Sequence, residues 1–170
     1  MKKQKLILIT ALLLSFTSVI SLAADTPQLD EHLQFLQPLM EHEWKGGYAD
    51  GDNSGVVIFL KFESVVGGKG VRYNREAPAL NNVTETHFYW HPEKKEVCFI
   101  SLNSRGFVSE GTAWAEDGSI ILQSKSYSAT DMREFKTIWK LNSEGKLTDT
   151  FFRKENGEWI QGHIQEFKTK

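Results

Sequence analysis

The side chains with the greatest capacity for metal chemistry in this 170-residue chain are its five histidines. His87 and His91 have the four-residue spacing of a helical zinc pair, and Glu85 precedes His87 by two residues. The surrounding residues predict a strand instead, on which four residues span about 13 Å at about 3.3 Å per residue. Zinc ligands lie about 2.0–2.1 Å from the ion. One ion cannot reach both imidazoles, so we expect no metal site.

His163 is a candidate for a different role. It follows Gly162 on the last predicted strand, where it is expected to share a face with Trp159 and Phe167. A lone histidine on a strand is more often a surface or core-edge residue, so from the residues alone we expect no cofactor. A cofactor-binding role for His163, as a ligand of haem, follows only from a resemblance described below.

Aromatic and polar side chains on the predicted strands could form a binding site for a small molecule. The chain has five Trp, four Tyr and eleven Phe. Apolar surface buried against such rings contributes about 25 cal/mol per Å², and a few inward polar groups set the ligand's orientation. The candidate ligand-binding residues are Arg75, His87, Tyr89, Trp114, Tyr127 and Trp139.

Catalytic motifs are not recognisable in the chain. It has no Gly-x-Ser-x-Gly sequence, and Gly67-Gly68-Lys69-Gly70 lacks the spacing of a phosphate-binding loop. No pair among the 22 acidic residues stands out by its spacing. We assign no catalytic residue, and the sequence favours a protein that is not an enzyme.

Ten extended segments are predicted to position these residues. Turn residues recur at intervals of roughly ten residues, as in all-β sandwiches and barrels, and such short connections force neighbouring strands to be antiparallel. The sequence predicts an all-β fold, an up-and-down (meander) barrel of about ten antiparallel strands. The predicted strands are 44–50, 55–64, 69–76, 82–91, 96–102, 107–116, 119–127, 133–141, 146–154 and 158–168.

A short helix is predicted before the first strand. Thr26 and Pro27 have the pattern of an N-cap followed by proline at the first helical position. Leucines at positions 29, 33 and 36 fall on one helical face. Pro38 is expected to end the helix, because proline disfavours helical geometry in the preceding residue. A helix this short needs a packing partner, so we expect it to cap one end of the barrel.

The first residues have the pattern of a secretion signal. Lys2, Lys3 and Lys5 precede an apolar run over 6–20, and small residues follow at 21–24. The run is also nearly long enough for an uncleaved anchor, but the small residues favour cleavage after Ala23 or Ala24. We expect a signal peptide at 1–23, a single barrel domain at 24–170, a periplasmic or secreted location and no stable membrane insertion after cleavage.

The charge and cysteine content limit the partners of the mature chain. Without the three lysines of the signal it carries 17 basic and 22 acidic residues, whereas a nucleic-acid binder presents a basic surface. We therefore expect no nucleic-acid partner. Cys98 is the single cysteine and lies in an apolar run, so we expect it to be a small buried hydrophobic residue.

Several short motifs resemble those of known barrel families. Leu36-x-x-Leu39 leading into Glu43-Trp44-Lys45-Gly46 resembles the opening of calycin-like barrels, the group of lipocalins and bacterial lipocalin-like domains. His42 stands where the lipocalin glycine would be. The runs 88–92 and 157–159 are similar to a bacterial lipocalin-like family of unknown function. This resemblance implies a barrel with a cavity and implies no substrate.

A second resemblance concerns the cofactor. Trp44-Lys45-Gly46-Gly47 and the late position of His163 are similar to nitrobindin-like haem barrels. In that family a histidine near the C-terminus binds the iron, so the resemblance implies haem at His163. The glycine spacing differs from that family's motif.

These observations lead to one main functional hypothesis and two alternatives. The main hypothesis is an exported single-domain barrel that binds a small apolar or amphipathic molecule in its cavity. The first alternative is a haem protein that handles nitric oxide or peroxide through His163. The second alternative is an envelope interaction or assembly protein with a filled barrel, which would act through an exposed apolar patch.

Overall fold

The computed structural model describes residues 28–40, 42–51 and 53–170. The predicted signal segment 1–23 and the predicted helix start at Thr26 and Pro27 lie outside the described residues. Within the described ranges, no helix is long and apolar enough to cross a membrane.

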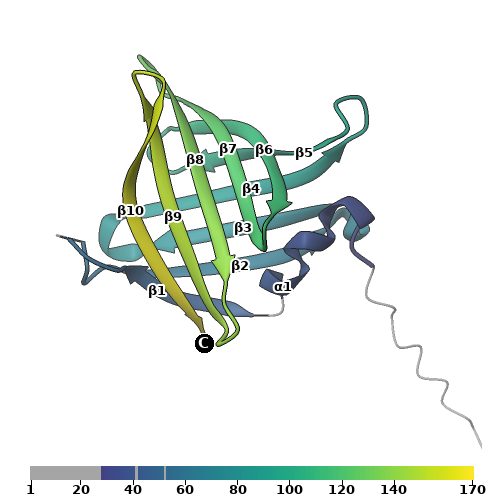
Figure 1. Cartoon of the computed structure of the whole chain (residues 1–170), viewed down its shortest axis with the longest axis horizontal. Helices are drawn as coiled ribbons and strands as arrows, with labels where there is room; N and C mark the ends of the chain where they lie inside the picture. Colours follow the sequence, from purple (N-terminus) through teal and green to yellow (C-terminus); the bar gives the residue numbers. More distant parts are fainter. Residues whose placement is uncertain (1–27, 41, 52) are drawn as a thin grey trace, which may run out of the picture.

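Ten strands form one closed antiparallel barrel (Figure 1). Each strand pairs with its neighbours in the sequence, and β1 pairs with β10 to close the ring. The strands are β1 (Glu43–Tyr48), β2 (Val57–Val65), β3 (Gly70–Ala77), β4 (Asn82–His91), β5 (Glu96–Asn103), β6 (Val108–Glu116), β7 (Ser119–Tyr127), β8 (Met132–Leu141), β9 (Lys146–Glu155) and β10 (Glu158–Thr169). Every predicted strand is present with its ends shifted by two residues or fewer, so the predicted all-β meander barrel is confirmed.

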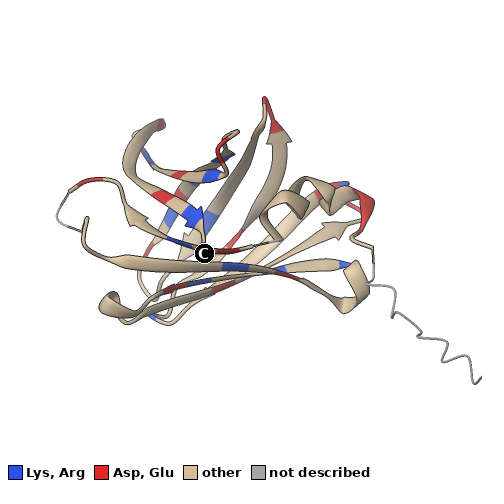
Figure 2. Cartoon of the chain, turned by 90° about the horizontal axis from the view of Figure 1, so that it is seen from below, with Lys and Arg blue, Asp and Glu red and all other residues tan. Residues whose placement is uncertain are grey.

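Side chains alternate between the interior of the barrel and its outer surface along the strands. On β2, Ile58, Leu60 and Phe62 are buried in the interior, while Lys61 and Glu63 lie on the outer surface and form an ion pair of 2.9 Å. Acidic and basic residues are interspersed over the strands and turns rather than gathered on one face (Figure 2). Surface pairs of this kind each contribute about 0–1 kcal/mol, so the fold depends mainly on its interior.

The helical segment packs across one end of the barrel, but its boundaries differ from the prediction. It consists of the 3₁₀ helix η1 (Glu31–Leu36) and one α-helical turn, α1 (Gln37–Met40). Asp30 is the N-cap, and its side chain accepts a hydrogen bond from the His32 N–H. Pro38 lies inside α1 rather than ending the helix. It is tolerated because it falls in the first turn, where the missing N–H has no intrahelical partner.

The interior is filled at the end that the helix covers, which we call the helix end. Leu33, Leu36 and Leu39 are buried there, and the Trp44 indole Nε1 donates to the Leu39 carbonyl oxygen at 2.9 Å. Strand residues from around the ring complete this core, among them Ile58, Phe62, Val71, Phe88, Leu147 and Phe167. Two further 3₁₀ turns, η2 (Val66–Gly68) and η3 (Pro78–Leu80), connect β2 to β3 and β3 to β4.

Candidate functional site

The half of the barrel away from the helix, which we call the open end, is hollow. A cavity of about 410 Å³ lies there and is lined by side chains of β3 to β10. Sites for small molecules typically measure about 300–1,000 Å³. The aromatic rings in its wall belong to Tyr73, Phe99, Phe135, Trp139 and Phe151. The interior is therefore not filled throughout, contrary to the premise of the interaction-protein alternative.

Two aromatic residues form the floor of the cavity against the filled core. Tyr73 stacks on Phe62 with ring centroids 4.6 Å apart, and Trp139 packs edge-on against both rings at 5.1 and 5.5 Å. Trp139 is only 3% exposed. These residues belong both to the core and to the cavity wall, so a change at Trp139 affects stability as well as any bound molecule.

An acidic residue is buried beside this floor. Asp149 is 8% exposed, and its Oδ2 accepts a hydrogen bond of 3.0 Å from the Trp139 indole Nε1. Burial raises the pKa of Asp149 to about 6, although the Trp139 donor and the charge of Arg75 both act in the opposite direction. A carboxyl group with so perturbed a pKa inside a cavity is a common mark of a functional site.

A β-bulge turns His163 into the cavity. Gln161 pairs with Phe152 and Ile164 pairs with Thr150, so Gly162 and His163 together lie opposite Phe151. A bulge of this kind re-aims the side chains that follow it. A Cβ at position 162 would lie 3.0 Å from the Phe151 ring, which favours glycine there.

One prediction about the last strand is wrong because of this bulge. Phe167 shares the inner face with His163, as expected, but Trp159 does not. The extra residue shifts the alternation by one position, and Trp159 lies on the outer surface, where Lys136 and Lys154 approach its ring within 5.1 and 5.6 Å.

His163 is a neutral imidazole in a mainly aromatic environment. Its ring stacks on Phe151 at 4.8 Å with an interplanar angle of 6°, and Tyr48 packs against its edge at 5.1 Å. Burial lowers the pKa of His163, and the positive charge of Arg75 lowers it further. The imidazole is therefore available as a hydrogen-bonding group or as a metal ligand at neutral pH.

Hydroxyl and amide groups near the mouth of the cavity satisfy one another. The Asn103 Nδ2 donates to the Thr84 Oγ1 at 2.7 Å and to the Asn82 Oδ1 at 3.2 Å. The hydroxyls of Thr86 and Ser101 are 2.7 Å apart. These side chains bond to one another, so the network shapes the wall of the cavity.

The structure places two of the six predicted ligand-binding residues in the cavity, Arg75 and Trp139, and it also places His163 there. His87 and Tyr89 lie on the outer face of β4, because Thr84, Thr86 and Phe88 occupy the inward positions. The His87 Nε2 pairs with the Glu85 carboxylate on that outer surface at 2.7 Å. The expected inward orientation of His87 and Tyr89 is therefore wrong.

Tyr127 also lies outside the cavity. It is 40% exposed on β7 and pairs with Val108 and Met132 on the outer surface of the barrel. Its neighbour Ser126 is buried instead. The inward position predicted for Tyr127 is wrong by one step of the strand alternation.

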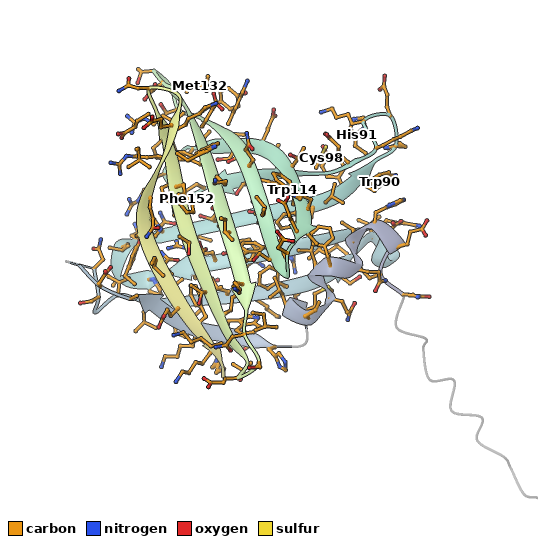
Figure 3. The ribbon with its side chains drawn as sticks, viewed as in Figure 1. Trp90, His91, Cys98, Trp114, Met132 and Phe152 are labelled. Carbon is orange, nitrogen blue, oxygen red and sulfur yellow. The ribbon has the colours of Figure 1, made fainter. Side chains whose placement is uncertain are left out.

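Trp114 lines a second hollow, a groove of about 780 Å³ that involves η1 and β4 to β8. Trp114, labelled in Figure 3, is 37% exposed and follows the buried Ala113 on β6, so it lies on the outer face of that strand. The position predicted for Trp114 in the barrel cavity is therefore wrong. The groove also contains Phe35 and a stacked pair formed by His32 and Trp90, with ring centroids 3.6 Å apart. Charged side chains of both signs surround these rings, namely Lys95, Glu96, Glu110, Lys125 and Glu134.

Three further residues line the cavity but are not among the binding residues predicted from the sequence: Asp149, Gln165 and Phe151. The alternation on β9 contains a signal for the first of these, because Asp149 occupies an inward position between Leu147 and Phe151. The sequence alternation alone does not show that Gln165 faces inward, because the bulge at Gly162 shifts the alternation along β10. No group of three potential metal ligands occurs among the described residues. Cys98 is buried as a free thiol, as predicted.

The fold and its hollow end define the molecule as a closed ten-stranded antiparallel barrel with an internal cavity. Neither the known protein families nor the curated proteins include a match to this sequence. Among solved structures, the chain is similar to Rv2717c from M. tuberculosis, with a TM-score of 0.55 and 15% sequence identity. The similarity covers 84% of this chain and 99% of Rv2717c, and it shows a shared barrel fold.

Proposed function

We propose that this protein is a calycin-like binding barrel that holds a small, partly apolar molecule in the cavity at its open end. The observation that carries the proposal is the composition of the cavity wall. Five aromatic rings lie beside Arg75, Asp149, His163 and Gln165. Rings provide apolar surface for a ligand, and a few charged or amide groups fix its orientation. The predicted signal peptide would make this an exported carrier or sensor.

The contrast between the two halves of the interior supports the same proposal. A protein selected only for stability would fill its core to a packing density near 0.74. Here the helix end is filled by large apolar side chains, while the open end carries serine, threonine and asparagine at inward positions. Small polar side chains in this half leave room for another molecule.

The proposal can be tested with native mass spectrometry and a neutral aromatic probe, 2-naphthalenemethanol. Excess mass that is lost on denaturation would identify a ligand retained from the cell. In the ligand-free protein, we expect the probe to bind and to change tryptophan fluorescence, because Trp139 lies in the cavity floor.

A matched pair of variants locates the bound probe. Thr137→Phe places a ring inside the cavity, and Thr150→Phe places the same ring on the outer face of the adjacent strand. We expect Thr137→Phe to lose binding and Thr150→Phe to retain it. Equal binding by both variants would show that the probe binds outside the cavity and would overturn the proposal.

Haem binding is a second candidate function, and one observation favours it. The bulge in β10 directs His163 into the cavity, and the lowered pKa keeps its imidazole neutral. His163 would be the axial ligand, and haem would supply the redox chemistry. The buried Asp149 carboxyl group in the same wall is an unfavourable neighbour for the apolar face of a large macrocycle. An intense haem absorption band that disappears in His163→Ala would establish this function instead.

A further inference from the structure

The cavity contains an arginine without an acceptor. Of the five arginines in the chain, four donate a hydrogen bond to a carboxylate or a carbonyl oxygen: Arg72, Arg105, Arg133 and Arg153. Arg75 lines the cavity, and no acidic group of the described residues lies within ion-pair distance of it. The one arginine that points into the hollow therefore keeps its donors free.

A second donor in the same cavity is also unsatisfied. Gln165 is 1% exposed, and its Nε2 has no hydrogen-bond partner in the described part of the chain. Gln165 lies directly opposite Asp149 in the pairing of β10 with β9 and opposite Tyr48 in the pairing with β1. A buried donor without an acceptor costs stability. Gln165 lies in the cavity wall, so a rotation of its buried amide toward the cavity would let a bound molecule supply that acceptor.

The acidic group of the cavity is already engaged. The Asp149 carboxylate accepts the Trp139 indole hydrogen bond at 3.0 Å, and no ion pair links it to Arg75 within the described residues. His163, the remaining titratable group near Arg75 besides Tyr73, is neutral. The cavity therefore offers free donors, including the full positive charge of Arg75, beside one carboxyl group whose Oδ2 accepts from Trp139.

We infer that the ligand carries a carboxylate, which binds the Arg75 guanidinium and accepts a hydrogen bond from the Gln165 amide, while its apolar body packs on the aromatic wall. The inference rests on the proposed binding function of the cavity. A guanidinium matches a carboxylate through two parallel hydrogen bonds. Each carboxylate oxygen has two lone pairs, so one of the oxygens bound to Arg75 can also accept a hydrogen bond from the Gln165 amide.

The test compares three probes that share one ring system: 2-naphthoate, 2-naphthalenemethanol and 2-naphthylmethylamine. Their affinities for the ligand-free full chain are measured by calorimetry at pH 7.5. We expect 2-naphthoate to bind at least tenfold more tightly than the neutral alcohol and the amine to bind most weakly. Equal binding of all three probes would overturn the inference and leave the proposed function intact. Failure of every probe to bind would overturn the proposed function itself.

Variants of two arginines on β3 test whether Arg75 causes the preference for the carboxylate probe. Arg75→Gln should reduce the affinity for 2-naphthoate at least tenfold and change the affinity for the alcohol less than threefold. Arg72→Gln is the control, because Arg72 lies on the outer face and pairs with Glu63 at 2.7 Å. It should leave both affinities unchanged. An unchanged preference in folded Arg75→Gln would overturn the inference.

A third variant separates charge from hydrogen-bonding geometry. Arg75→Lys keeps the charge but loses the planar fork, and we expect it to retain a reduced preference for the carboxylate. It also replaces Arg75→Gln if that variant does not fold. If the amine binds most tightly to the unaltered protein, Asp149 anchors the ligand and the inference is wrong.

Discussion

The two halves of the barrel interior are built from the same ten strands and yet differ in kind. At the helix end, Trp44, Phe88, Leu147 and Phe167 are at most 1% exposed, and the Trp44 indole donates to the Leu39 carbonyl oxygen. At the open end, the inward positions carry a charged pair of residues that do not bond to each other, an unsatisfied amide and a cavity of about 410 Å³. The helix end stabilises the fold through its packed core, and the open end contains groups that lower stability.

This difference has a direct physical interpretation. Buried charges and unsatisfied donors weaken a folded protein unless another interaction compensates. Residues that break the packing rules are expected at functional sites, where stability is lost in exchange for binding. The comparison predicts that substitutions at the helix end destabilise the protein, while some substitutions at the open end stabilise it.

The largest effect is expected from truncating a core ring at the helix end. Phe88→Ala removes a side chain that is 1% exposed and packs against Phe99 and Trp139. Phe-to-Ala changes in cores cost about 3–5 kcal/mol, and we expect a loss in that range by urea denaturation. Phe135→Ala at the open end is the matched comparison. Its ring already borders the cavity, so we expect a loss of less than about 2 kcal/mol. Equal losses at both positions would contradict the division into halves.

The sequence was sufficient to predict the barrel because its signals are local. Turn residues such as Asp117-Gly118 and Asn156-Gly157 adopt positive φ angles in the structure, as their composition indicates. The two-residue alternation placed Phe135, Thr137 and Trp139 on one face, and that face is the inner one. Strand order followed from the short connections.

The candidate site was less predictable because it depends on orientation and on contacts between distant strands. On β4, both faces carry large or polar side chains, so the alternation did not reveal that His87 and Tyr89 lie outside. On β10, one extra residue in the bulge places His163 inward and Trp159 outward. The pairing of Trp139 with Asp149 joins two strands across a turn, and nothing in the local sequence marks it.

The next largest effect is expected at the buried acid of the open end. Asp149→Asn keeps an acceptor for the Trp139 indole and removes the buried charge. Because burial raises the pKa of Asp149 from its ordinary value of 3.8 to about 6, we expect the variant to be about 2–3 kcal/mol more stable than the parent at pH 8. Urea unfolding at several pH values measures the difference.

The sign of the pH dependence follows from proton binding. Between about pH 4 and pH 6 the folded chain holds a proton on Asp149 that the unfolded chain has released. The contribution of Asp149 to stability is therefore complete below pH 4 and is lost as the pH rises through 6. Asp149→Asn should lack this decline, and a parallel pH profile in the two proteins would contradict the assignment of a raised pKa.

A smaller effect is expected at the unsatisfied amide. Gln165→Leu replaces a buried group whose Nε2 has no partner among the described residues with an apolar side chain of similar size. Removal of such an orphan donor should stabilise the ligand-free protein by about 1 kcal/mol. The same variant should weaken 2-naphthoate binding several-fold. A stabilised variant with unchanged affinity would retain the contrast between the halves and remove Gln165 from the binding site.

The smallest effect is expected at the bulge that directs His163 inward. Gly162→Ala brings a Cβ to 3.0 Å from the Phe151 ring, and that ring stacks on His163. A displacement of a few tenths of an ångström relieves the contact, so the loss of stability should be about 0.5 kcal/mol.

The imidazole of His163 loses part of its aromatic cover when Phe151 moves. Because burial is the main cause that lowers the pKa of His163, we expect that pKa to rise toward its ordinary value of 6.5 in an NMR titration. Gly55→Ala, at a position with open space around it and no positive φ angle, should leave the titration of His163 unchanged. An unaltered titration in Gly162→Ala would show that the bulge does not control the surroundings of the imidazole.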